Sequence, residues 1–175
     1  MNPPEIMDLY RRNPREGFRR LYEEFAPRLQ AYLVRAFGLD GQAAEDHIQD
    51  AFLPWVETPA AMAAVANPSA YLFASVRNGV LRQRRRPATV PCDEDRLAAT
   101  PGAATGAGPD PDLAIDIQAA LATLPDEQRE AVVMRIWGGL SLAEAADQQG
   151  VPLQTLASRY RYGLARLKEI IPWQT

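Results

Sequence analysis

The chain has 175 residues, enough for one domain or two small ones, and 47% of them are hydrophobic, as in an ordinary globular protein. Its formal net charge of −3 argues against a protein that coats nucleic acid non-specifically. A single Cys and a single His exclude an internal disulfide and argue against a zinc site or a His-based triad, so we expect no metal and no cofactor. No apolar run approaches the roughly 20 residues of a membrane span, and the first residues lack the apolar core of a signal peptide. We therefore expect a cytoplasmic protein that does not contact the membrane.

Helical periodicity dominates the first half of the chain, after a segment, 1–15, that we expect to be flexible. Apolar residues at helical spacing predict a helix over about 16–37. The next helix is expected over roughly 42–56, where Pro54 should kink or end it. A third helix is predicted from Pro68 or Ser69 to about Arg85. Together these helices predict a first domain over residues 16–86.

Residues 87–112 differ from the rest in composition. They are rich in Pro, Gly, Ala and Thr, contain scarcely any large apolar residue, and carry one Arg against five acidic residues. Such a segment cannot bury enough surface to offset the entropy of ordering, so we expect a flexible acidic linker.

The remaining residues, 113–172, predict a four-helix domain. Its second helix opens at Pro125 and is expected to turn Ala131, Val132 and Ile136 inward. Ser141 and Glu144 have the spacing of a capping box at the start of the third helix, and Gly150 suits the left-handed turn that ends it. The last two helices and this turn form a helix-turn-helix. The predicted fold is therefore all-α, with two small helical domains joined by a flexible linker.

The helix-turn-helix is the strongest indication of DNA binding. The outward face of the last helix carries polar, basic and aromatic groups that can meet phosphates and base edges: Gln154, Thr155, Ser158, Arg161 and Tyr162. Arg159 lies at the flank of this face, where a DNA contact and an ion pair with Glu144 are both open. A plain four-helix domain that packs against another protein is the alternative interpretation of this half.

Two further surfaces stand out in the first half. Residues 69–86 interleave arginines with Tyr71 and Phe73, a pattern that suits single-stranded or melting DNA, although a solvated basic helix end explains it equally well. Asp46, Gln49 and Asp50 form an acidic face. Nothing nearby supplies a nucleophile, a metal ligand set or a phosphate loop, so we expect a protein-contact face or plain solvated surface, not a catalytic site.

The order of these segments resembles a bacterial RNA polymerase sigma factor of the extracytoplasmic-function (ECF) group of the sigma-70 family. The match to sigma region 2 includes the segments AAEDHIQDAFLPW and SAYLFASVRNGVLRQRRR. The match to region 4 is LPDEQREAVVMRIWGGLSLAEAADQQGVPLQTLASRYRYGLARLK. The two motifs in this order, across a linker, are strongly specific.

The resemblance implies a promoter-specificity subunit that has no catalytic residue and whose partners are core RNA polymerase and promoter DNA. It places core polymerase, through the β′ clamp helices, against Asp46, Gln49 and Asp50, and it adds the β flap as a second contact. It assigns the −10 element, with help in strand opening, to Tyr71, Phe73, Arg77, Asn78 and Arg82. It assigns the −35 element to the helix that carries Gln154, Thr155, Ser158, Arg159, Arg161 and Tyr162.

Four residues depart from the pattern of this family: Pro54 inside its helix, Gln149 in place of an apolar residue, and Ala157 and Tyr162 where basic residues are common. Whether an anti-sigma protein also binds is left open. The alternative function is a stand-alone helix-turn-helix regulator that binds duplex DNA through residues 113–171. The basic and aromatic segment 69–86 distinguishes the two, because a simple repressor has no use for it.

Overall fold

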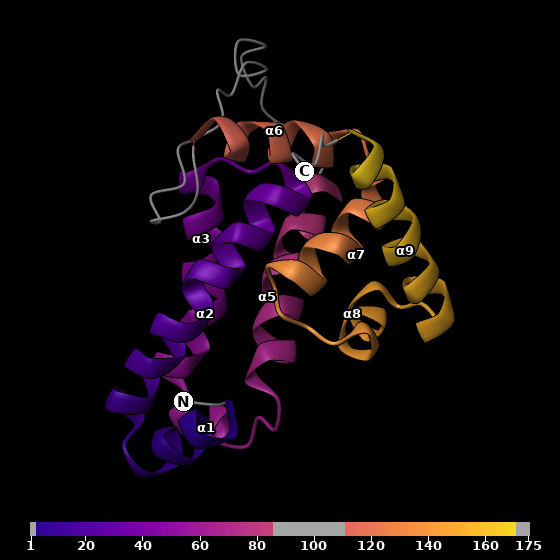
Figure 1. Ribbon diagram of the computed structural model, residues 1–175. Helices are drawn as coiled ribbons and strands as arrows, with labels where there is room; N and C mark the ends of the chain where they lie inside the picture. The colour runs from indigo at the N-terminus through magenta and orange to yellow at the C-terminus, as the bar shows by residue number, and fades with distance from the viewer. Residues whose placement is uncertain (1–2, 86–110, 171–175) are drawn as a thin grey trace.

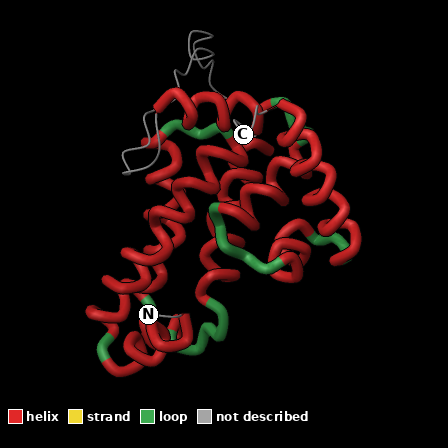
Figure 2. Tube along the Cα trace, viewed as in Figure 1, coloured by secondary structure: helices red, strands yellow, loops and turns green. Residues whose placement is uncertain are grey.

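A computed structural model of the chain describes residues 3–85 and 111–170, with side chains placed from residue 117 onward in the second range. Every regular element in these ranges is a helix (Figure 2). The helices are α1 (Pro3–Arg12), α2 (Pro14–Phe37), α3 (Gly41–Glu57), α4 (Pro59–Met62), α5 (Pro68–Arg85), α6 (Pro111–Ala122), α7 (Asp126–Ile136), α8 (Leu142–Gln149) and α9 (Leu153–Ile170). The all-α prediction is confirmed. Residues 87–110, most of the expected linker 87–112, lie outside the described residues.

The first domain is built on α2, which packs against both α3 and α5. Asn13 caps the start of α2 by accepting a hydrogen bond from the Glu16 amide at 3.3 Å. At the other end Gly38 adopts the left-handed conformation (φ 69°), which closes the helix. The buried apolar face of α3 consists, as expected, of Ala44, Ile48, Ala51, Phe52 and Trp55.

Residues 3–12, which we expected to be flexible, instead form α1. This helix buries Ile6, Met7 and Tyr10 and packs along α2. The Tyr10 hydroxyl donates to the Trp55 carbonyl at 2.5 Å, and the two rings meet edge to face. The crossing of α1 and α2 needs a glycine at Gly17, because a Cβ there would collide with the backbone of Tyr10. The N-terminal helix is therefore part of the first domain's core.

Pro54 does not end α3, which continues to Glu57. A proline inside a helix removes one backbone donor. Here the turn that follows Pro54 is stabilised by side-chain packing and by hydrogen bonds to the Pro54 carbonyl. Trp55 is buried against Tyr10 and Tyr71, and the Pro54 carbonyl accepts hydrogen bonds from both the amide and the hydroxyl of Thr58, each at 2.9 Å. Tertiary packing thus overrides the local signal for a helix end.

The second domain contains the expected helix-turn-helix, formed by α8, a turn and α9. Ser141 and Glu144 make both hydrogen bonds of a capping box, and Gly150 adopts the left-handed conformation (φ 65°) after α8. Ala145, Ala146 and Leu156 are buried where the two helices meet. One expectation for α7 was wrong: the side chain of Ile136 is half-exposed, while the carboxylate residue Glu130 is buried.

The two domains pack against each other. Helices α6 and α7 lie against α2, and α8 lies against α5, so that the second domain covers one side of the first (Figure 1). Buried apolar residues from both domains form one continuous cluster. This contact determines which of the predicted functional residues are accessible.

Candidate functional site

One exposed face of α3 carries the predicted acidic residues. Asp46, Gln49 and Asp50 are all exposed, and Gln42 donates to Asp46 at 3.2 Å from the preceding turn. The same face continues with Leu53 and Val56, whose side chains are 50% and 62% exposed. Large apolar residues of this kind, next to carboxylates, are typical of a protein-contact surface. We call Asp46, Gln49, Asp50, Leu53 and Val56 the α3 face.

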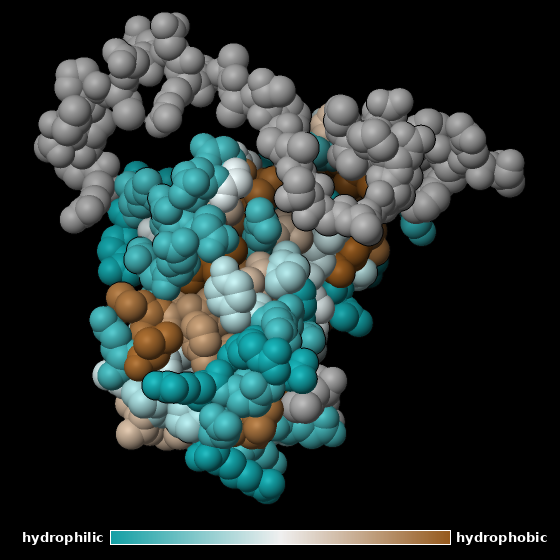
Figure 3. All heavy atoms as spheres, turned by 90° about the vertical axis from the view of Figure 1, so that its left-hand side faces the viewer, coloured by the Kyte–Doolittle hydropathy of each residue, from teal (hydrophilic) through white to brown (hydrophobic). Residues whose placement is uncertain are grey.

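The apolar part of the α3 face was missed in the sequence, although a signal for it exists. Leu53 and Val56 follow Gln49 and Asp50 at helical spacing, while the buried side of the helix is already occupied by other residues. The side of the molecule shown in Figure 3 is mainly hydrophilic, with apolar groups exposed among the polar ones.

A hollow of about 300 Å³ lies between α3 and α5. It brings Asp50, expected at a polymerase contact, together with Asn78 and Arg82, expected at the −10 element. His47 lines the same hollow and shares a hydrogen bond of 2.9 Å with Gln83, which ties the two helices together. The two predicted surfaces of the first domain are therefore adjacent.

The five residues expected at the −10 element do not share one environment. Asn78 and Arg82 are exposed on α5. Tyr71 is half-buried and meets the Trp55 ring edge-on, with centroids 5.7 Å apart. Phe73 is fully buried against Tyr32, and Arg77 faces the second domain.

Arg77 pairs with Glu130 of α7, its Nε lying 2.8 Å from Oε1. The hydroxyl of Tyr32 donates to the same carboxylate oxygen at 2.7 Å. Burial, together with the nearby Glu130 carboxylate, holds the pKa of Tyr32 well above its ordinary value, so the phenol stays protonated and can donate. Two residues of the first domain thus satisfy one buried carboxylate of the second.

The outward face of α9 matches its expected position. Gln154, Thr155, Arg161 and Tyr162 are exposed, Ser158 is partly buried, and the Arg161 guanidinium lies over the Tyr162 ring at 5.2 Å. This face leaves polar and basic groups free to meet a duplex.

Arg159 does not form the ion pair with Glu144 that was one of its two open interpretations. Its Nη1 donates to Gln149 Oε1 at 2.7 Å. Glu144 instead accepts hydrogen bonds from Ser141 in the capping box and from the Asn67 amide at 2.8 Å. Burial raises the pKa of Glu144, but these hydrogen bonds outweigh it and bring the pKa below its ordinary value. Glu144 is thus a structural carboxylate.

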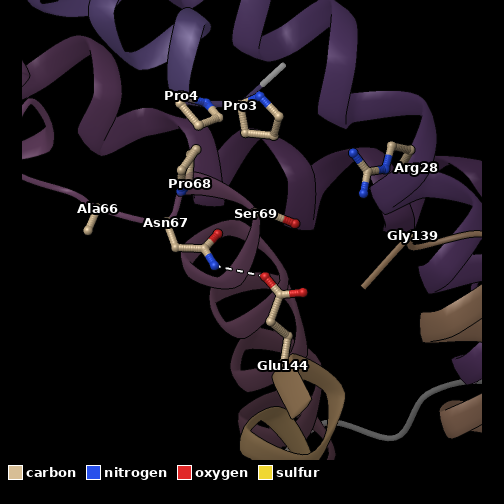
Figure 4. Close-up of a pocket in the computed structure, with 9 residues that line it drawn as sticks. All are labelled: Pro3, Pro4, Arg28, Ala66, Asn67, Pro68, Ser69, Gly139 and Glu144. Atoms are coloured by element: carbon tan, nitrogen blue, oxygen red, sulfur yellow. Dashed lines mark hydrogen bonds between the residues drawn. The ribbon is translucent and has the colours of Figure 1, made fainter. Parts of the chain in front are cut away.

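A second cavity, of about 290 Å³, lies between the domains (Figure 4). Arg28 of α2 and Glu144 of α8 both border it, and Asn67 donates to Glu144 at its edge. Arg28 also donates to the Gly138 carbonyl in the second domain. The cavity follows from the packing of the two domains. Among the described residues no cluster of His, Cys, Asp or Glu could hold a metal ion.

Comparison with known proteins decides the family. The model of sigma-70 region 2 matches residues 21–89, and that of sigma-70 region 4 matches residues 114–167. The ECF RNA polymerase sigma factor SigL of Mycobacterium tuberculosis is 33% identical over 157 residues, which cover 86% of each chain. The chain belongs to the ECF sigma factors of the sigma-70 family. As a sigma factor it directs RNA polymerase to promoters through regions 2 and 4, and it is not an enzyme.

Two further relatives agree with this assignment. The RNA polymerase sigma factor CarQ of Myxococcus xanthus is 29% identical, over 94% of this chain and 95% of that protein. Among solved structures, the sigma factor RpoE of Bartonella quintana, crystallised with the anti-sigma factor NepR, superposes with a TM-score of 0.69. That match has 26% identity and covers 91% of this sigma factor and 99% of the other chain. Within the described part of the chain, no helix has the length and hydropathy to cross a membrane.

Proposed function

We propose that the sigma factor holds a promoter at two places and core polymerase at a third, with each contact on its own helix. Helix α9 reads the −35 element, α5 engages the −10 element and helps to open it, and the α3 face docks on the β′ clamp helices. The observation that carries this proposal is the exposed face of α9, on the same chain as an exposed acidic and apolar face on α3. In this proposal the first domain comprises residues 16–86 together with α1, and the second domain comprises residues 113–172. Residues 87–112 are the linker between them.

The −35 assignment is supported by the chemistry of the α9 face. Gln154 and Thr155 lie at the start of the helix, where a recognition helix meets base edges. Ser158 and Arg159 lie one turn further along, and Arg161 with Tyr162 follows them. Amide, hydroxyl and guanidinium groups pair with bases and phosphates in a major groove.

The −10 assignment is supported by the basic and aromatic residues of α5. Asn78 and Arg82 are already exposed and can meet the phosphates or bases of a melted strand. Arg77 belongs to the same helix and joins the proposed contact once its partner Glu130 in the second domain has moved away. Tyr71 and Phe73 complete the proposed set on α5, where their rings pack against Trp55 and Tyr32 of the first domain.

The polymerase assignment rests on the α3 face. Carboxylates that steer a basic partner, next to half-exposed apolar side chains that can be buried on docking, are the two components of a specific interface. We place the β flap of the polymerase against the second domain. We also propose an anti-sigma protein as a partner, by extension from the relative crystallised with NepR, and the cytoplasm as the place of action.

Replacing Arg161 with Ala should weaken binding to promoter DNA without weakening binding to core polymerase. Loss of one guanidinium contact in a groove costs about 1–3 kcal/mol, roughly 5–150-fold in affinity. The measurement uses the reconstituted holoenzyme and promoter fragments selected by run-off transcription, with binding followed by band shift and footprinting of the −35 region.

Arg166→Ala is the matched control, because Arg166 is exposed on the same helix but about 140° away around its axis. An Arg161→Ala holoenzyme that binds and protects the −35 region as well as the Arg166→Ala holoenzyme does would contradict the assignment of α9.

A further inference from the structure

We propose that His47 is a positioning residue, which couples the polymerase-docking helix α3 to α5 and holds the exposed Asn78 and Arg82 in place for the −10 element. The inference rests on the proposed function for the roles of these two helices, and it adds a residue that carries neither role itself. His47 is half-buried on α3, and the structure gives it two partners on α5, Gly79 and Gln83. We call His47, Gly79 and Gln83 the His47 joint.

The first contact of the His47 joint is a hydrogen bond. His47 Nε2 lies 2.9 Å from Gln83 Oε1, and because an amide oxygen can only accept, the imidazole donates. The two residues are 36 positions apart in the sequence, so the bond joins two different helices. It is a long-range tether between α3 and the last turn of α5, which ends at Arg85.

The second contact is one of shape. The imidazole lies against α5 at Gly79, where a Cβ would come within 3.0 Å of His47 Nδ1 and 3.5 Å of Cε1. The backbone of Gly79 is helical and has no positive φ, so its conformation does not require a glycine. Glycine is also less favourable than alanine inside a helix. The close approach of the His47 ring therefore accounts for the glycine at this position.

The His47 joint lies beside two of the residues expected at the −10 element. Gly79 and Gln83 directly follow Asn78 and Arg82, and the members of each pair are four residues apart, which places each pair on one side of the helix. The two sides differ by about 100° around the helix axis. His47 therefore holds one side of α5 while Asn78 and Arg82 stay exposed on the neighbouring side, where they line the hollow between α3 and α5.

The last turn of α5 is weakly packed. Val80 is the last buried residue of this helix, and residues 82–85 are all exposed. Helix ends fray unless packing or hydrogen bonds hold them. Arg84 tethers this turn to the end of α2 by donating to the Phe37 carbonyl at 2.7 Å, and His47 tethers it to α3. Loss of the His47 contact would leave the turn that carries Arg82 held on the α2 side alone.

Order in this turn bears on the contact with the −10 element. A side chain that reaches a base or a phosphate binds more strongly when its helix is already ordered, because less conformational entropy is lost at the moment of contact. His47 also shares α3 with Asp50, which lines the same hollow as Asn78 and Arg82. A polymerase docked on α3 would therefore fix the position of the −10 residues through the His47 joint.

The first test measures residue-resolved hydrogen exchange of backbone amides in the free, full-length protein. His47→Ala and Gln83→Ala should each speed up exchange in residues 81–85 by about 3–10-fold, the effect of one lost side-chain hydrogen bond. The double variant should add little to either change, because both remove the same bond. Gln30→Ala is the matched control, since it removes the same amide side chain from an exposed position on α2 and should change nothing in α5. Unchanged exchange in His47→Ala would overturn the inference whatever the polymerase does.

The second test uses the reconstituted holoenzyme on a promoter selected by run-off transcription, with strand opening followed by permanganate reactivity of thymines in the −10 region. His47→Ala should slow opening by about 3–10-fold while the affinity for core polymerase stays unchanged. Gly79→Ala should also slow opening, because its methyl group would displace the imidazole. In the His47→Ala background the same Gly79→Ala change should cause no further loss, since the ring it would displace is absent.

The two tests separate this inference from the proposed function. If His47→Ala loosens the end of α5 but the holoenzyme opens the promoter as fast as before, the His47 joint is only structural, so the inference fails while the proposed function stands. If Gly79→Ala slows opening equally with and without His47, the coupling between the two residues is contradicted. If the unmodified holoenzyme itself opens no promoter, the proposed function fails and the role of the joint in opening fails with it.

Discussion

Replacing both Asp46 and Asp50 with Lys is expected to weaken the affinity of the sigma factor for core RNA polymerase by roughly tenfold or more, while leaving its fold intact. Both side chains are exposed on α3, and the buried side of the helix is formed by other residues. The substitutions therefore change the sign of the α3 face without disturbing the core. Affinity is measured by titrating labelled sigma factor with purified core enzyme, and stability by thermal unfolding.

The control for this experiment changes the net charge equally at another place. Asp8→Lys with Glu23→Lys alters two exposed acidic residues of α1 and α2, outside both the α3 face and the second domain, and it should leave core affinity close to that of the unmodified protein. Equal affinities for the two double variants would remove the assigned role of Asp46 and Asp50. A separate test of the apolar part is Leu53→Ser with Val56→Ser, which should weaken docking without any change of charge.

The second large effect concerns stability. Replacing Tyr10 with Ala should lower the free energy of unfolding by about 3–5 kcal/mol, the usual cost of deleting a large buried aromatic side chain. Tyr10 is fully buried between α1 and the rest of the first domain, and its loss would also leave the Trp55 carbonyl without the hydroxyl that donates to it. Chemical denaturation, followed by circular dichroism, measures this change in the free energy of unfolding.

Two further variants serve as controls for Tyr10→Ala. Tyr10→Phe keeps the ring and should cost only about 1 kcal/mol, the net value of one hydrogen bond. Tyr162→Ala removes the same kind of side chain from an exposed position on α9 and should change stability very little. If Tyr10→Ala destabilises the protein no more than Tyr162→Ala does, α1 is not docked on the first domain.

Local patterns in the sequence predict most of the helices. The apolar spacing in α2 and α3, the capping box at Ser141 and the left-handed Gly150 are all short-range signals, and each is found where it was expected. The failures have a common physical cause. Pro54 predicts a kink or an end of the helix locally, but α3 runs through it to Glu57 because Trp55 is buried against distant aromatic rings. Helix α1 is stabilised by packing on α2, a long-range contact that the spacing of its own ten residues does not predict.

The candidate sites could be predicted only as far as their chemistry is local. Exposed groups on one helix face, such as Asp46 or Arg161, follow from helical spacing. The pairing of Arg77 with Glu130 joins residues 53 apart in the sequence, and that of Tyr32 with Glu130 joins residues 98 apart. No spacing rule reaches across a linker, so the partners of the buried glutamate on α7 become evident only when the two domains are seen together.

The most direct test of promoter-specific initiation by this sigma factor is transcription in a purified system. Core RNA polymerase from the same organism is combined with the sigma factor and a library of genomic fragments, and run-off transcripts are mapped to their start sites. We expect transcripts from a small set of promoters that share −35 and −10 elements, and none of them without the sigma factor. If no fragment is transcribed specifically and the sigma factor does not co-elute with core enzyme, its role as a promoter-specificity subunit is contradicted.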